Sequence, residues 1–437
     1  MKYIKRLSLI PVFLLSLMSS AQEVKSIAKE EVVKEVLESN RKLKISEQEF
    51  LQARADYRQT NAVFLPNISV SHTAMTTNNP LMAFGSKLNQ ESITQSDFNP
   101  ALLNNPDQIN NFATKLEVKQ PILNFDAFAQ RGAAKSKMQA KKLQSQRTQD
   151  AMQLEVEKAY MQLQLAYKAV DVLEKALEAA KENKKLADNS FKQGYLQKSD
   201  VLAVEVRVGE VENKLAYARS NVKNASNYLS FLMSEEQDVV LKPTDSLQVN
   251  SMAGASADKI HEERADIKAM ALASEAREKM HQADKLAFLP RLNAFGSYEL
   301  YDSEIFQGGA NGYVAGVALS WDIFKGSKRF GKAEKSQAEA EQARLEYDQY
   351  VSQSKMELNK AERAVEDAGN KLNLTRLALQ QSEEALRIRK NRFEQGLEKT
   401  TDLLMSETQY SQKQLEYYQT VYEYNYALEY LKFLSQG

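Results

Sequence analysis

The chain has 437 residues, and its 58 basic and 58 acidic side chains give a formal net charge of 0. This balance indicates neither a basic surface for binding nucleic acid nor a polybasic patch for binding a membrane surface. The absence of cysteine excludes disulfides, thiolate metal sites and a lipid-modified N-terminal cysteine.

Residues 1–21 are interpreted as a secretory signal peptide. Three basic residues precede an apolar run from Leu7 to Met18, and the small residues from Ser19 to Ala21 form a cleavage site. Its removal takes away three positive charges and no negative one, so the net charge changes from 0 to −3. No other segment approaches the roughly 18 apolar residues of a membrane-spanning helix, so a chain that crosses a bilayer must use strands.

Two equivalent junctions predict a switch from helix to strand. A helical pattern from about Val24 to Val63 ends at Phe64-Leu65-Pro66, because proline forces the preceding residue out of a helix. Residues 67–74 then alternate with period two, as a strand with one apolar face does. The same junction recurs at Phe288-Leu289-Pro290 and is followed by an alternating segment at 291–298.

A loop and a second strand follow each junction. Residues 77–111 are rich in Asn, Pro and Ser and are predicted to form a long loop with turn chemistry, whereas the counterpart at 302–312 is much shorter. Second strands are predicted at 112–120 and 313–323. Their alternation is typical of a transmembrane barrel, with Tyr313 and Trp321 at the two interfacial girdles, although a soluble two-layer sheet alternates too.

The four predicted strands are too few to close a barrel, since known outer-membrane barrels have about eight or more. Open edges in lipid would leave backbone groups without hydrogen-bond partners. The chain is therefore expected to share its barrel with copies of itself under closed cyclic symmetry.

Four long helices carry apolar residues in alternating steps of four and three, which is the heptad spacing of a coiled coil. A helix from about Phe128 to Phe191 would be about 95 Å long, which exceeds a compact domain. One such helix alone would favour an ordinary core or dimer contact. Four of matched length favour an extended tube or rod.

A tetrapeptide ends the first helix of each pair and occurs twice, 202 positions apart. Glycine in a left-handed conformation ends a helix, and an aspartate a few residues on offers oxygen atoms to the next helix. Each copy therefore predicts a tight tip between antiparallel helices. The two tips and their aspartates are Phe191-Lys192-Gln193-Gly194 with Asp200, and Phe393-Glu394-Gln395-Gly396 with Asp402.

The repeat indicates two homologous halves that build one mainly α body with a transmembrane β portion. Each half has the order helix, strand, strand, long helix, long helix. After the signal peptide, the first half is expected at 22–233, a linker at 234–257, and the second half at 258–437.

The duplicated tips, the paired Phe-Leu-Pro junctions and this element order make the chain resemble the TolC-type outer membrane efflux protein family over essentially the whole mature sequence. The resemblance implies a homotrimer with a twelve-stranded β-barrel, continued by a coiled-coil α-barrel tunnel in the periplasm. It implies a passive exit duct in the Gram-negative outer membrane, within a tripartite efflux or type I secretion system. The implied partners are outer-membrane lipid, a periplasmic adaptor (membrane fusion) protein and an inner-membrane pump.

The resemblance also assigns roles to the tips. It implies adaptor contact at Phe191, Gln193, Gly194, Phe393, Gln395 and Gly396. Asp402 matches a position where some members line the periplasmic constriction with aspartate, and Asp200 is its repeat equivalent, so both are candidate gate residues. Both also fit plain helix capping. The chain departs from the family pattern at Met405, where a second aspartate can occur, and at Phe393 and Glu398, where some members place polar locking residues.

No catalytic, metal or cofactor site is expected, and the chain is not predicted to be an enzyme. Residues 326–332 fit a phosphate-binding loop, but Ala333 replaces the hydroxyl residue that would hold Mg²⁺. The three histidines, His72, His261 and His281, do not form a metal motif. Two alternatives stay open, namely an exported soluble coiled-coil scaffold or tether and a nucleotide-binding protein that uses residues 326–332.

Overall fold

The computed structural model describes residues 24–236, 239–251 and 263–435. The predicted signal peptide lies outside these residues, as does His261. The chain divides into two compact units, and each takes segments from both halves of the sequence. We call residues 42–149, 259–357 and 435–437 the sheet unit, and residues 1–41, 150–258 and 358–434 the tip unit.

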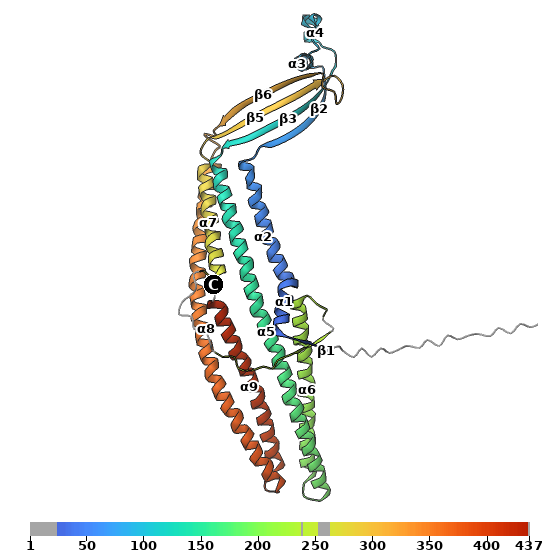
Figure 1. Ribbon diagram of the computed structural model, residues 1–437, viewed down its shortest axis with the longest axis vertical. Helices are drawn as coiled ribbons and strands as arrows, with labels where there is room; N and C mark the ends of the chain where they lie inside the picture. Colours follow the sequence, from blue (N-terminus) through green and yellow to red (C-terminus); the bar gives the residue numbers. More distant parts are fainter. Residues whose placement is uncertain (1–23, 237–238, 252–262, 436–437) are drawn as a thin grey trace, which may run out of the picture. The chain divides into compact units, whose positions relative to one another are not determined.

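A four-stranded antiparallel sheet forms the centre of the sheet unit (Figure 1). The predicted strands are all present. Three of them are longer than predicted, and the one expected at 313–323 lies three residues earlier, at 310–320. The spatial order is β2-β3-β5-β6, so the strand pairs of the two halves meet at the β3–β5 boundary. The strands are β2 (Asn67–Thr77), β3 (Ile109–Leu123), β5 (Arg291–Asp302) and β6 (Ala310–Ser320).

The pairing register gives this sheet one apolar and one polar face. Val70 pairs with Leu116, which pairs with Tyr298, which pairs with Tyr313. Because side chains alternate along a strand, the neighbouring row lies on the other face. That row consists of Ser71, Lys115, Glu299 and Gly312. On this polar face Lys115 Nζ lies 3.0 Å from a Glu299 carboxylate oxygen.

The segment predicted as a long loop at 77–111 is partly helical, so that expectation was wrong in detail. It contains α3 (Pro80–Asn89), the 3₁₀ turn η2 (Gln95–Phe98) and α4 (Pro100–Asn104), which lie beyond the end of the sheet (Figure 1). The Asn-Pro pairs that suggested turns begin these helices instead. Asn79 and Asn99 accept backbone N–H groups at 3.3 and 2.9 Å, and a proline occupies the first helical position.

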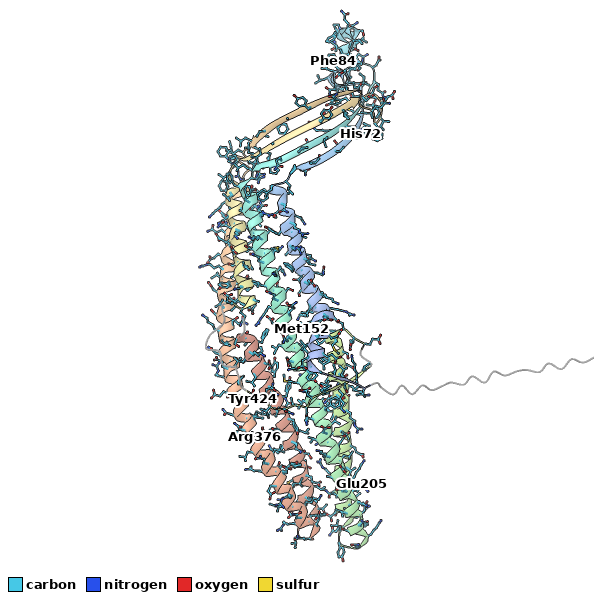
Figure 2. The ribbon with its side chains drawn as sticks, viewed as in Figure 1. His72, Phe84, Met152, Glu205, Arg376 and Tyr424 are labelled. Atoms are coloured by element: carbon cyan, nitrogen blue, oxygen red, sulfur yellow. The ribbon has the colours of Figure 1, made fainter. Side chains whose placement is uncertain are left out.

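The two helical hairpins have their tips in the tip unit, while residues 125–149 and 328–357 at the start of their first helices belong to the sheet unit. The first hairpin is formed by α5 (Phe125–Lys192) and α6 (Lys198–Met233), and the second by α8 (Lys328–Glu394) and α9 (Thr400–Ser435). The predicted heptad positions form their core, since Val156 and Leu163 on α5 are at most 1% exposed. Met152 on α5 and Tyr424 on α9 are also buried and are labelled in Figure 2.

The single helix predicted from Val24 to Val63 is interrupted, which corrects that expectation. The segment forms β1 (Val24–Ile27), α1 (Lys29–Ser39), α2 (Arg41–Gln59) and the turn η1 (Thr60–Val63). Asn40 has extended backbone angles, and its Nδ2 donates to the Leu232 carbonyl at 2.7 Å. This tertiary bond stabilises a break that helical periodicity does not reveal.

The predicted linker at 234–257 contains a strand in its described part. There β4 (Val240–Pro243) pairs in parallel with β1. The connecting segment 239–251 then bonds to three helices in turn. Ser226 Oγ of α6 accepts the Leu241 N–H, Tyr160 of α5 donates to Asp245 at 2.5 Å, and Asn425 of α9 donates to the Gln248 carbonyl at 2.7 Å.

The remaining helix, α7 (Ala265–Leu286), belongs to the sheet unit and precedes β5. No helix of the described residues is both long and apolar enough to cross a membrane.

Candidate functional site at the helical tips

Both tip glycines have the left-handed backbone that the sequence predicted. Gly194 has φ +82° and Gly396 has φ +72°. The closing bonds are repeat-equivalent, since the Gly194 N–H donates to Phe191 O at 3.0 Å and the Gly396 N–H to Phe393 O at 2.9 Å. A Cβ at either glycine would meet no atom within 4 Å, so the backbone angle alone requires glycine.

The tips present apolar side chains to solvent. Tyr195 is 79% exposed and Leu397 is 62% exposed, and Phe191 also lies largely outside any core. Gln193 and Gln395 are exposed, whereas Phe393 is half-buried. Exposed apolar residues on a tight turn give a surface on which another protein can bury area.

The second tip contains an internal ion cluster. Glu398 accepts from Arg389 Nη1 at 2.6 Å and from Arg392 Nε at 2.9 Å, and both arginines belong to the last turns of α8. The carboxylate therefore rigidifies its own turn. Within the described residues, the Glu398 carboxylate has no hydrogen bond or ion pair to the first hairpin.

The two candidate gate aspartates differ in their contacts. Asp200 Oδ2 accepts the backbone N–H of Gln197 at 3.1 Å, which is a capping contact at the start of α6. The Asp402 backbone N–H donates to Lys399 O at 3.1 Å, while its carboxylate has no hydrogen bond within the described part of the chain. Both side chains are half-buried. Capping is thus observed for Asp200, and Asp402 keeps a carboxylate free for another role.

Sequence reasoning missed a buried polar link between the hairpins. Asn183 Nδ2 of α5 donates to Oε1 of Glu407 on α9. Burial raises the pKa of Glu407, and the Asn183 bond and the charge of Arg207 oppose this only in part. The repeat itself contains the signal, because the 202-residue shift pairs Asn183 with Ala385 and Arg207 with Gln409. Polar residues that break the repeat mark contacts that only one hairpin makes.

Arg207 lies in a groove of about 550 Å³ between α6 and α9, which also includes Met405 and Thr401. The residue is 7% exposed, and its Nε and Nη1 atoms are buried without a hydrogen-bond partner. Its Nη1 lies 3.5 Å from Glu210 Oε2, so a carboxylate stands near the guanidinium without saturating it. The groove therefore has a buried cation in its wall.

The rejected sites have structural roles. Gly326 has φ +65°. Lys332 Nζ, however, forms an ion pair at 2.6 Å with the buried carboxylate of Asp284 on α7, so it is not free for a phosphate. His72 Nδ1 lies 2.9 Å from Thr114 Oγ1, and His281 Nδ1 lies 3.2 Å from Ser336 Oγ. Within the described ranges, no group of three or more His, Asp or Glu residues is placed to hold a metal ion.

Comparison with known proteins agrees with this architecture. The sequence model of the outer membrane efflux protein family matches residues 32–235 and 257–435. No curated protein matches the chain in sequence.

Solved structures with a similar fold share few residues with this chain. One is VceC, an outer membrane protein from Vibrio cholerae, with 19% identity, TM-score 0.79, and coverage of 94% of this chain and 96% of that one. A membrane protein from Pseudomonas aeruginosa has 18% identity, TM-score 0.80 and coverage of 93% of each chain. The CmeC outer membrane channel of Campylobacter jejuni has 18% identity and TM-score 0.79, with coverage of 100% and 93%. At these identities the likeness establishes the fold.

Proposed function

Because this chain belongs to the outer membrane efflux protein family, we propose that it is the passive exit duct of a tripartite efflux or type I secretion system. Family membership places the chain in the cell outer membrane, and its role there is that of an efflux channel. The duct itself carries out no chemistry, so the energy for transport comes from an inner-membrane pump.

The two-faced sheet is the single observation that carries this proposal. Val70, Tyr313 and Val317 on the apolar face are all more than half exposed, which is unfavourable in water and favourable against lipid. The polar face, with Lys115, Glu117 and Lys119, is suited to a water-filled lumen. A soluble scaffold would have to cover the apolar face with other parts of the protein.

The edges of the sheet support a trimer. The outer sides of β2 and β6 have no strand partner in the described chain. Strand edges in lipid must be paired, so β6 of one copy would join β2 of the next. Three copies supply twelve strands, and the helices of the copies continue them as a tunnel that extends into the periplasm.

The tips are proposed to contact a periplasmic adaptor protein through Phe191, Gln193, Gly194, Phe393, Gln395 and Gly396. The exposed Tyr195 and Leu397 would add apolar area to this contact. Asp200 and Asp402 are proposed to lie at the periplasmic constriction, with Asp402 as the stronger candidate because its carboxylate is free of a cap. The link between Asn183 and Glu407 would hold the hairpins together in the closed state.

Light scattering on protein extracted from outer membranes, with the detergent contribution removed, tests the assembly, and planar-bilayer recordings test conduction. A mass near three chains together with discrete conductance steps would support the proposal. Asp402→Ala should then reduce the preference of the pore for cations or its block by cations. Unchanged selectivity would show that Asp402 is not a gate residue. Recovery as a soluble monomer or dimer without conductance would overturn the duct and favour the exported scaffold.

A further inference from the structure

An open recess of about 840 Å³ lies on the polar face of the sheet, where α2 and η1 lead into β2. This volume falls in the range of small-molecule sites in proteins. The recess belongs entirely to the sheet unit. Its walls are formed by Arg58, Gln59, Asn61, Ala62, Leu65, Pro66, Asn67, Lys119, Gln120, Pro121, Asn293, Ala294, Phe295 and Ala318.

The polar groups of the recess favour a negative ligand. The lining has two cations, Arg58 and Lys119, and five carboxamide side chains, but no acidic residue. Lys119 Nζ forms an ion pair at 2.7 Å with Glu117, which does not line the recess. Arg58 has no ion pair within the described residues. Because no carboxylate lines the recess, the guanidinium and the ammonium give it a positive potential. Such a potential favours binding of a carboxylate or sulfonate group.

Two of the carboxamides are oriented as donors by neighbours outside the recess. Asn61 Oδ1 accepts from Arg131 Nη1 at 2.6 Å, and Asn293 Oδ1 accepts from Asn124 Nδ2 at 3.3 Å. With both oxygens occupied, the amide nitrogens are the groups left for a ligand. Donor N–H groups add to the preference for an anion.

The recess also has an apolar wall. The ring of Phe295 packs over Gly316 on the neighbouring strand, where a Cβ would approach the Phe295 Cζ atom to 3.1 Å. Glycine at 316 thus lets the ring lie against β6. Leu65, Pro66 and Ala318 extend this apolar surface. A flat hydrocarbon body fits such a wall, since aromatic rings favour stacked or edge contacts.

We propose that the recess is a cargo-binding subsite for organic anions with an aromatic or otherwise apolar body. The acid group would bind Arg58 and Lys119, and the body would lie on Phe295. This inference rests on the proposed function, because the recess is exposed to transported cargo only if the polar face lines the duct. It identifies a class of cargo that the tips do not specify.

The test uses the purified full chain in phosphatidylcholine nanodiscs and radiolabelled 2-naphthoate in equilibrium dialysis, with empty nanodiscs to subtract lipid partition. Neutral 2-naphthamide is the competitor that keeps the ring and replaces the carboxylate by an uncharged carboxamide. The double variant Arg58→Gln/Lys119→Gln removes both cations, and Phe295→Leu alters the apolar wall. Arg54→Gln is the matched control, because it removes an exposed cation one turn earlier on α2 and outside the recess.

We expect saturable naphthoate binding that weakens about tenfold or more in the double variant, where two charge-assisted contacts are lost. Phe295→Leu should weaken it to a smaller extent, and Arg54→Gln should leave it within about twofold. Equal competition by naphthamide, equal loss in Arg54→Gln, or no saturable binding would each overturn the subsite. Planar-bilayer conductance of the same purified proteins separates the two proposals, since a conducting protein that does not bind naphthoate refutes only the recess. Binding without conductance refutes only the duct.

Discussion

Asn183 of α5 donates a hydrogen bond to the half-buried carboxylate of Glu407 on α9, and this bond joins the two hairpins within the tip unit. The repeat counterparts of these residues are Ala385 and Glu205. Glu205 is exposed on α6 and is labelled in Figure 2. The link therefore exists on one side of the duplication only, and a gate built on it would act on one contact between hairpins rather than on two.

Loss of this link should open the tips. Asn183→Ala leaves the Glu407 carboxylate buried without its donor, at a cost of about 1–3 kcal/mol to the closed state. We expect a larger single-channel conductance or open probability in planar bilayers. Glu407→Ala should have a similar effect, and the double variant should add little because both changes remove one contact. Glu205→Ala is the control, and an equal increase there would contradict the assignment.

Stability should depend on the protonation of Glu407. Burial raises its pKa in the folded state, so the folded protein binds this proton more tightly than the unfolded chain does. The group therefore favours folding at low pH, and its contribution falls as the pH rises through the raised pKa. The unfolding temperature of the wild type, relative to Glu407→Gln, should decrease as the pH rises above about 4.5. A constant difference over this range would refute the prediction.

Substitution of the tip glycines should destabilise the hairpins through the backbone. Gly194→Ala and Gly396→Ala each place a Cβ on a residue with positive φ, at a cost of about 1–2 kcal/mol. Gly209→Ala, in the interior of α6 with no atom within 4 Å of the added Cβ, should instead stabilise by up to about 1 kcal/mol. Denaturant unfolding of the full chain measures these differences, and the same sign at all three positions would be inconsistent with this account.

A charge cluster at the start of α7 should be critical for the sheet unit. Asp266 binds Arg264 Nε at 2.7 Å and Tyr350 OH at 2.7 Å, and its carboxylate lies 3.2 Å from Arg147 Nε. Asp266→Ala leaves the buried Arg264 without this carboxylate and should cost about 3–5 kcal/mol. Asp348→Ala, at an exposed position on α8, should change the free energy of unfolding by less than about 0.5 kcal/mol.

The cluster around Asp266 should also make the stability of the protein depend on pH in the acid range. Burial alone would raise the pKa of Asp266, but hydrogen bonds from Arg264 and Tyr350 and the charge of Arg147 lower it overall. Its stabilising contribution is therefore present above the unfolded pKa and is lost as the pH falls through the lower folded value. Asp266→Asn should flatten the acid limb of the stability profile below about pH 4, as followed by circular dichroism.

The two faces of β6 provide a matched test of membrane contact. Val317 on the apolar face is 62% exposed and Val314 on the polar face is 58% exposed. Val317→Lys should cost about 2–4 kcal/mol against lipid and reduce recovery in the outer-membrane fraction. Val314→Lys should be tolerated, because its side chain would meet water in the lumen. Equal recovery of both variants would place the sheet outside lipid.

Local features were predictable from the sequence alone. Gly194 and Gly396 end their helices because only glycine adopts a left-handed backbone at low cost, and this property needs no partner. The heptad positions of α5 and the alternation of β3 and β6 follow from fixed periods of 3.5 and 2 residues. The duplication predicted the order of the elements, and the match of the family model to both halves confirms the family that this order suggested.

Only the tertiary structure decided how distant segments meet. The pairing of β1 with β4, the break at Asn40 and the Asn183–Glu407 bond each join residues more than 190 positions apart. Sequence periodicity carries no information on such pairs, because many partners satisfy the same donor or strand edge. The Asn-Pro pairs at 79 and 99 fit both a turn and a helix start, and the recess lined by Arg58, Lys119 and Phe295 exists only because folding brings three elements together. Periodicity and backbone preference determined the elements, and long-range packing determined the sites.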